Sequence, residues 1–297
     1  MAPPRQPATR RRVNPALLGL SLPAIIWYIA FTLGPLLAMF YIALLKWPGL
    51  IAPRSFIGLD NFVKVFTDPV FFTAVKNSII QVGIVVPVMI PVAFMLGYYV
   101  NLKPRGHRVL RVILFTPALI SLAAKSVVFL SIFAPNGLIN GFLANIGLDQ
   151  LSKPWLASTS TALGTVMVVD LWSGIGYTAI LFSARLAAVP VEVMEAAELD
   201  GCAHWGRMWR IAYPICRDYF GVLAMLQFIW VLFSSAGSIL LLTNGGPGNS
   251  STNLSFLVYD KAFTQSDLGY SQAVGVILFF VGILGMVIIR RVFAARH

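Results

Sequence analysis

The sequence is short of charged residues, and acidic ones are the scarcest. Only 11% of the 297 residues are charged, and Lys and Arg outnumber Asp and Glu by 22 to 11. A typical soluble domain carries about 25% charged residues. Apolar residues make up 58% of the chain, and its mean hydropathy is +0.81. This balance excludes an ordinary soluble globular domain.

Cysteine and histidine are nearly absent, with two of the first and three of the second. Cys202 and Cys216 fall on the cytoplasmic side of the topology predicted below, where a disulfide is not expected. The scattered histidines form no ligand cluster, so we expect no metal site and no intramembrane enzyme. The phosphate-binding Gly-Lys-Ser/Thr loop is also missing, so any ATP and Mg must be bound by a separate chain.

Long uncharged runs take the place of these residues. Residues 16–45, 77–102 and 268–289 contain 30, 26 and 22 residues without a charge. A helix needs about 20 apolar residues to cross a bilayer. Short alternating strands, which a membrane barrel would need, are not evident. The runs therefore predict an all-α polytopic membrane protein.

The basic residues are clustered rather than spread along the chain. Fifteen of the 22 Lys and Arg lie in residues 5–12, 103–111, 185–217 and 290–296. Loops rich in Lys and Arg stay in the cytoplasm, so these four segments are predicted to lie inside. The net charge of +11 then reflects topology, and we expect no nucleic-acid partner.

Together these patterns predict six transmembrane helices in the plasma (inner) membrane of a prokaryote, with both termini cytoplasmic. The first span is expected to be uncleaved, peripheral to a five-helix core and bent at Pro23 and Pro35. The predicted spans are residues 16–45, 77–101, 109–133, 157–184, 219–242 and 269–289, between tails 1–15 and 290–297.

The coupling loop, residues 190–214, is the longest predicted cytoplasmic loop. Pro190 suits the first turn of a helix, and acids near that end favour it. Gly201 is placed to stop the helix, and a second short helix is expected over residues 205–211. Such a helix–turn–helix suits insertion into a groove of a partner. An amphipathic helix that packs only on its own subunit is the alternative.

The residues of this loop resemble the EAA loop of ABC importer permeases. The matching positions are Glu195, Ala196, Ala197, Asp200, Gly201, Ile211 and Pro214. The resemblance implies a type I ABC importer permease fold, in which this segment, with Glu192 at its start, forms the coupling helix that docks on an ATPase. Cys202 and Tyr213 depart from the usual alanine and leucine.

Two further segments resemble the carbohydrate branch of these permeases. Residues 56–62 and 243–247, followed by Leu254 and residues 259–263, resemble the first permease of maltose and glycerol-3-phosphate importers. The resemblance implies a second homologous permease, two ATPase copies, an extracytoplasmic solute-binding protein and a sugar substrate, with lipid around the spans. A non-sugar solute such as glycerol-3-phosphate, or an ion-driven secondary transporter, is the alternative.

Asp170 lies near the middle of the fourth predicted span. Burial of an ionisable group there costs about 2.5–3.5 kcal/mol on insertion scales, so it is expected to face the protein interior or a water-filled cavity. Gly174 and Tyr177 share its helical face, with Trp172 and Ser173 beside them. A carboxylate that accepts hydrogen bonds from hydroxyl groups and an aromatic ring for stacking would suit a sugar. In similar permeases this stretch lines the substrate cavity.

Two other polar positions are substrate candidates. Lys125 in the third span is expected to pair with Asp170, to snorkel outward or to meet substrate. Ser235 matches a cavity-lining position of similar permeases, although serine is also common at helix contacts. Asp170 has a structural alternative too, paired with Lys125 or with backbone. As a substrate ligand, its acid would suggest a solute of positive character.

Overall fold

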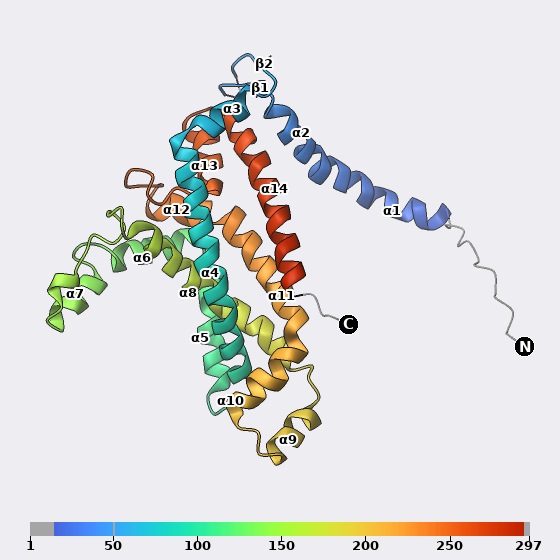
Figure 1. The fold of residues 1–297 in the computed structure, drawn as a ribbon, viewed down its shortest axis with the longest axis vertical. Coiled ribbons are helices and arrows are strands. Elements are labelled where there is room, and N and C mark those ends of the chain that lie inside the picture. The colour runs from blue at the N-terminus through green and yellow to red at the C-terminus, as the bar shows by residue number, and fades with distance from the viewer. Residues whose placement is uncertain (1–14, 50, 294–297) are drawn as a thin grey trace, which may run out of the picture.

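The computed structural model of the chain describes residues 15–49 and 51–293 and is almost wholly helical (Figure 1). Five helices are long and apolar enough to cross a membrane, or six when one bent pair counts as a span. This confirms the all-α polytopic class. Most of the two predicted tails, residues 1–14 and 294–297, lies outside the described residues.

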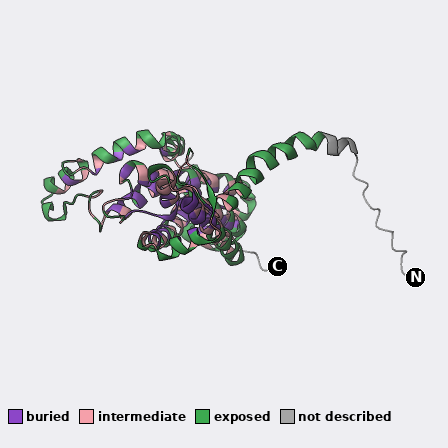
Figure 2. Ribbon diagram, turned by 90° about the horizontal axis from the view of Figure 1, so that it is seen from above, coloured by how far each residue is buried: buried purple, intermediate pink, exposed green. Residues whose placement is uncertain are grey.

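The first span stands apart from the bundle. It joins α1 (Pro15–Tyr28), η1 (Ile29–Leu33) and α2 (Gly34–Ile42) into one helix. Figure 2 shows this helix exposed while the buried residues gather in the bundle. The wide π turn η1 ends just before Pro35, where the missing N–H would break a regular helix. The helix stops before residue 45 because a short antiparallel pair, β1 (Leu45–Lys46) and β2 (Ser55–Phe56), follows.

The second span is longer than its apolar run. After α3 (Asp60–Thr67), α4 (Pro69–Asn101) begins at Pro69 rather than at residue 77. The Asp68 side chain caps α4 by accepting from the Val70 N–H at 2.8 Å, and proline suits the first helical turn. Cap chemistry, not hydropathy, therefore sets this boundary.

The third span, predicted over residues 109–133, is not one helix in the structure. It consists of α5 (His107–Leu119) and α6 (Leu122–Ile132), which are bent by 101°. Ser121 explains the break, because its hydroxyl accepts from the Ala124 N–H at 3.2 Å and caps α6. Beyond α6, α7 (Leu138–Asn145) and η2 (Asp149–Leu151) project from the bundle (Figure 1).

The fourth and fifth spans enclose the coupling loop. The fourth is α8 (Ala162–Leu186), and α9 (Val191–Leu199) follows it. The fifth is continuous with the second half of the loop, so the separate short helix predicted over residues 205–211 does not form. Its parts are α10 (His204–Arg207), η3 (Met208–Ala212), α11 (Tyr213–Ile229) and η4 (Trp230–Ser234), followed by α12 (Ala236–Leu242).

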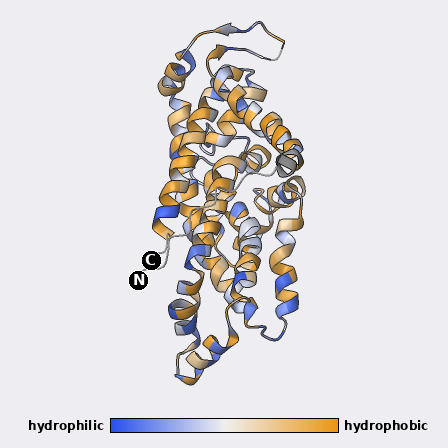
Figure 3. Cartoon of the chain, turned by 90° about the vertical axis from the view of Figure 1, so that its right-hand side faces the viewer, coloured by the Kyte–Doolittle hydropathy of each residue, from blue (hydrophilic) through white to orange (hydrophobic). Residues whose placement is uncertain are grey.

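The segment expected as an external loop, residues 243–268, folds back into the bundle. It forms α13 (Leu254–Tyr259) and η5 (Asp260–Thr264), and residues 251–257 are all buried. Asn77 of α4 donates to the Thr252 carbonyl at 2.8 Å. The last span, α14 (Leu268–Phe293), packs against α13 and α11. Figure 3 shows apolar residues along the helices and polar residues gathered at their lower end.

Candidate functional site

The coupling loop has the turn that its sequence predicts. Helix α9 starts after Pro190, carries Glu192 in its first turn and is followed by Asp200. Gly201 then adopts a φ of +73°, the left-handed conformation that favours glycine. The Gly201 N–H donates to the Glu198 carbonyl at 3.0 Å, which closes the end of the helix. The chain re-enters a helix at His204, so α9 is held as a short element of its own.

One face of α9 is free and the opposite face is packed. Ala197 is buried against the subunit, whereas Glu192 and Ala196 are exposed. Leu199 is 89% exposed. Small, acidic and apolar residues thus lie together on a surface that the subunit leaves uncovered.

Ile211 and Pro214 lie elsewhere in the loop, in the helix that becomes the fifth span. Ile211 is half-buried in η3, and Pro214 is exposed in the first turn of α11. The η3 turn ends just before Pro214, as η1 does before the proline of the first span. The spacing from Gly201 to Ile211 and Pro214 therefore corresponds to a helix that continues through Pro214.

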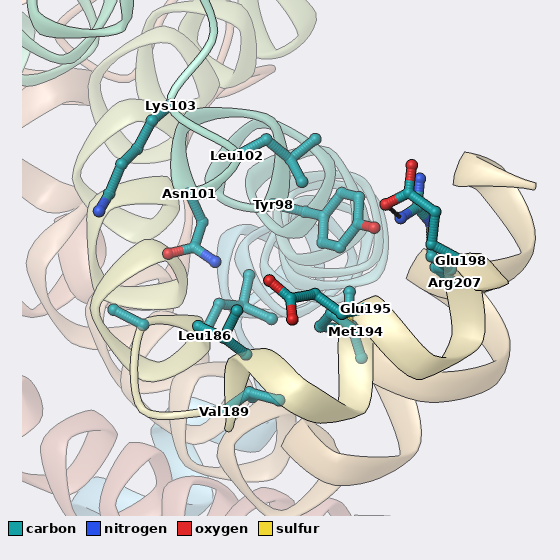
Figure 4. A pocket seen from close by; sticks show the side chains of 13 residues that line it. Tyr98, Asn101, Leu102, Lys103, Leu186, Val189, Met194, Glu195, Glu198 and Arg207 are labelled. Atoms are coloured by element: carbon teal, nitrogen blue, oxygen red, sulfur yellow. Dashed lines mark hydrogen bonds and ion pairs between the residues drawn. The ribbon is translucent and has the colours of Figure 1, made fainter.

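A cavity of about 290 Å³ lies between α9 and the cytoplasmic ends of α4 and α8 (Figure 4). Glu195 lines it from α9, and Arg207 forms an ion pair with Glu198 across the turn. The Tyr98 hydroxyl and the Arg207 Nε–H are buried there without a partner among the described residues. The ion pair ties α9 to α10.

The helix that starts at α10 links the coupling loop to the middle of the bundle. His204–Ser234 runs without interruption for 31 residues, or about 46 Å at about 1.5 Å per residue. Its far part carries Leu226, Gln227 and Trp230 on the wall of a second cavity. A displacement at the coupling loop therefore has a continuous helix along which to reach that cavity.

This second cavity, hereafter the bundle cavity, has a volume of about 340 Å³. Lys125, Ser173, Gly174 and Tyr177, all predicted to bind substrate, line it. The Lys125 Nζ donates to the Ser173 Oγ at 3.2 Å. The other lining residues are Ala118, Leu226, Gln227 and Trp230. Two aromatic rings, neutral polar groups and one ammonium thus face one space.

Asp170 and Ser235 do not line the bundle cavity. Asp170 is 1% exposed, and its carboxyl accepts from the Ser238 Oγ at 2.7 Å and from the Gln81 Nε2 at 3.1 Å. Asn253 continues the network, because its Nδ2 donates to the Gln81 Oε1 at 2.7 Å and to the Ser235 Oγ at 2.6 Å. This polar network joins α4, α8, α12 and the start of α13.

Asp170 and Lys125 are not paired. Within the described part of the chain, ion pairs join Arg207 to Glu198 and Lys261 to Asp68, and neither involves these two. Trp172 lies away from the cavity lining as well, with its ring edge-on to Phe129 at 5.1 Å.

Gly174 has a packing role in addition to its place in the cavity wall, since a Cβ there would collide with the end of the Met89 side chain. Sequence reasoning missed Gln81, Asn253 and Trp230. A glutamine inside an apolar run was the available signal for Gln81, whereas nothing in the sequence indicated that residues 251–257 are buried.

The described residues contain no group of three His, Cys, Asp or Glu side chains that could hold a metal ion. A helical membrane bundle with a coupling loop at one end and a cavity in its middle has the architecture of a transporter subunit.

Comparison with known proteins makes this specific. Residues 78–296 match the family described as binding-protein-dependent transport system inner membrane component, and the chain belongs to that family.

Two relatives cover nearly the whole chain. The permease of a diacetylchitobiose uptake system from Streptomyces coelicolor is 31% identical, over 93% of this chain and 81% of its own. A probable ABC transporter permease from Bacillus subtilis, YurN, is 30% identical, over 87% of this chain and 89% of its own. These are transport subunits and not enzymes, and the chain is accordingly a multi-pass component of the inner membrane. The relatives give no support to the ion-driven alternative.

A solved structure shares the fold. A bacterial ABC transporter involved in the import of the acidic polysaccharide alginate has a chain that matches with a TM-score of 0.81 at 22% identity. The match covers 94% of both chains. It confirms the ABC importer permease fold that the coupling loop implied.

Proposed function

We propose that this chain is the translocation subunit of an ATP-driven importer for a saccharide. It pairs with a second homologous permease, and two copies of an ATPase that bind ATP and Mg dock below the pair. An extracytoplasmic solute-binding protein delivers the substrate. The observation that carries the proposal is the free face of α9, tied by the Arg207–Glu198 ion pair to a helix that reaches the bundle cavity.

The mechanism follows from alternating access. Closure of the ATPase dimer on ATP moves α9, and α10 through η4 carry that movement to the wall of the bundle cavity, which opens outward. Hydrolysis and release reverse the movement and open the cavity inward. The chain supplies binding and coupling, and no bond of the substrate is broken.

The lining of the bundle cavity supports a saccharide. Tyr177 and Trp230 offer faces on which sugar rings stack, and Ser173 and Gln227 offer hydrogen bonds to hydroxyls. A volume of about 340 Å³ lies within the range of small-ligand pockets, about 300–1,000 Å³. The relative from a diacetylchitobiose uptake system supports the same class. A non-sugar solute such as glycerol-3-phosphate is the second candidate, and a panel of uptake substrates separates the two.

Co-purification tests the docking role. Glu195→Lys reverses the charge of an exposed residue of α9, and Gly201→Asp puts a side chain where φ is +73°. Both are expected to release the ATPase from the detergent-solubilised complex. Asp149→Lys, an exposed charge reversal in η2 on the predicted outer side, is the matched control and keeps it bound. Retention of the ATPase by both coupling-loop variants would refute docking through α9.

A further inference from the structure

The bundle cavity has one charged residue in its lining, and that residue is basic. Lys125 is the only acidic or basic side chain among the residues that line the cavity in the described part of the chain. Ser173, Gln227 and Tyr177 are neutral donors and acceptors, and the remaining lining is apolar or aromatic. The only formal charge on the described cavity lining is therefore the Lys125 ammonium.

Within the described residues no acid forms an ion pair with that ammonium, although Asp170 lies near enough to interact with it electrostatically. Both oxygens of Asp170 accept hydrogen bonds, one from Ser238 and one from Gln81, and Asp170 is not part of the cavity lining. The group that holds the Lys125 Nζ is the Ser173 hydroxyl at 3.2 Å, which carries no charge. An ammonium with three donors, one of them used by Ser173, has hydrogen-bonding capacity left for a ligand.

The N-terminus of α6 contributes a partial positive charge beside the Lys125 ammonium. Ala118, near the end of α5, and Lys125, in the first turns of α6, both line the cavity, so the 101° break lies at its wall. A helix N-terminus carries a partial positive charge. A lysine there gains nothing from the dipole of its own helix, and its position is explained better by a ligand than by helix stability.

We propose, on the basis of the saccharide function above, that the bundle cavity selects saccharides that carry an anionic group, a carboxylate or a phosphate, and that Lys125 determines this specificity. The anionic oxygens accept a charge-assisted hydrogen bond from the Lys125 ammonium while Tyr177 and Trp230 stack on the ring. Amino sugars are disfavoured by like-charge repulsion. This reverses the positive substrate character that Asp170 suggested when only the sequence was considered.

Direct binding measures this selectivity apart from the solute-binding protein. The permease–ATPase complex in nanodiscs, without binding protein, is titrated with two matched sets of disaccharides. One set contains glucuronate, glucose or glucosamine, and the other contains the corresponding acid, neutral sugar and amino sugar of the galacto series. Glucose 6-phosphate and galactose 6-phosphate, each against its parent sugar, form the phosphate arm. The anionic member is expected to bind about tenfold to hundredfold more tightly than its neutral counterpart, since hydrogen bonds to charged groups are the strong ones.

Lys125→Gln keeps a hydrogen-bonding side chain but removes the charge, and it is expected to abolish the preference for the anionic member of each pair. Lys153→Gln, a charge loss in the segment that follows η2, serves as the control and keeps the preference. Equal binding of neutral and anionic sugars by the unmodified complex, or a preference that survives Lys125→Gln, would overturn the proposal. If no saccharide of any charge binds, the saccharide function itself fails, and the inference falls with it.

Discussion

Replacement of Asp170 by leucine removes the acceptor of two buried hydrogen bonds. The Ser238 Oγ and the Gln81 Nε2 donate to its carboxyl at 2.7 and 3.1 Å, and Asp170 is 1% exposed. A buried donor left without a partner costs about 1–3 kcal/mol. Two such donors give an expected loss of about 2–6 kcal/mol in the free energy of unfolding, enough to lower the yield of folded protein severely.

Asp170→Asn is expected to be tolerated, because the network has one orientation that accommodates it. The Gln81 amide cannot turn round, since its Oε1 accepts from Asn253 at 2.7 Å. The new amide oxygen therefore accepts from Gln81, and the new NH₂ donates to Ser238, whose hydroxyl rotates. The exchange preserves the contacts, with an expected cost below about 1.5 kcal/mol.

Thermal unfolding of the purified complex, followed by size-exclusion chromatography, compares the two variants, and ligand titration then measures saccharide affinity in Asp170→Asn. Affinity is expected to be unchanged because Asp170 does not line the bundle cavity. A variant that stays as stable as the unmodified protein and loses saccharide binding would show that Asp170 contacts substrate, and would refute the structural role.

Three further predictions concern the coupling loop and helix packing. Gly201→Ala keeps the loop composition but strains a residue at a φ of +73°, so it is expected to cost about 1 kcal/mol and to weaken ATPase retention in a pull-down. Arg207→Met keeps the buried stem but removes the ion pair with exposed Glu198. We expect little change in melting temperature but fewer substrate molecules imported per ATP in proteoliposomes. Gly176→Ala places a Cβ against the Leu114 backbone, which cannot yield as a side chain does; folded protein on size exclusion is expected to be lost, whereas Gly141→Ala, where a Cβ meets nothing within 4 Å, leaves it unchanged.

The helical class and the coupling loop could be predicted from sequence because their signals are local. An apolar run reports a span directly, and the acids, alanines and Gly201 specify a helix, its end and its turn within one short stretch. The break in the third span also had a local signal, because Ser121 is a favourable N-cap residue. It is easily overlooked because it lies within a long apolar run, which by itself indicates one helix.

The candidate site was harder to predict, because its lining depends on which helices pack against each residue. Asp170 and Tyr177 share a helical face. Side chains of α12 and α4 cover Asp170, whereas Tyr177 lines the bundle cavity. Helical periodicity fixes direction around an axis and says nothing about which neighbour lies there. The buried stretch 251–257 closes the network through Asn253, and its burial depends on contacts with residues far away in sequence, such as Asn77.

ATP-driven uptake in proteoliposomes tests the central claim most directly. The complex is reconstituted with its ATPase and binding protein, and saccharide uptake is measured with ATP at the ATPase side, with ADP instead, and with ionophores that collapse ion gradients. Uptake is predicted to require ATP, to resist the ionophores and to disappear with Glu195→Lys. Uptake that an ion gradient sustains without ATP would contradict the account.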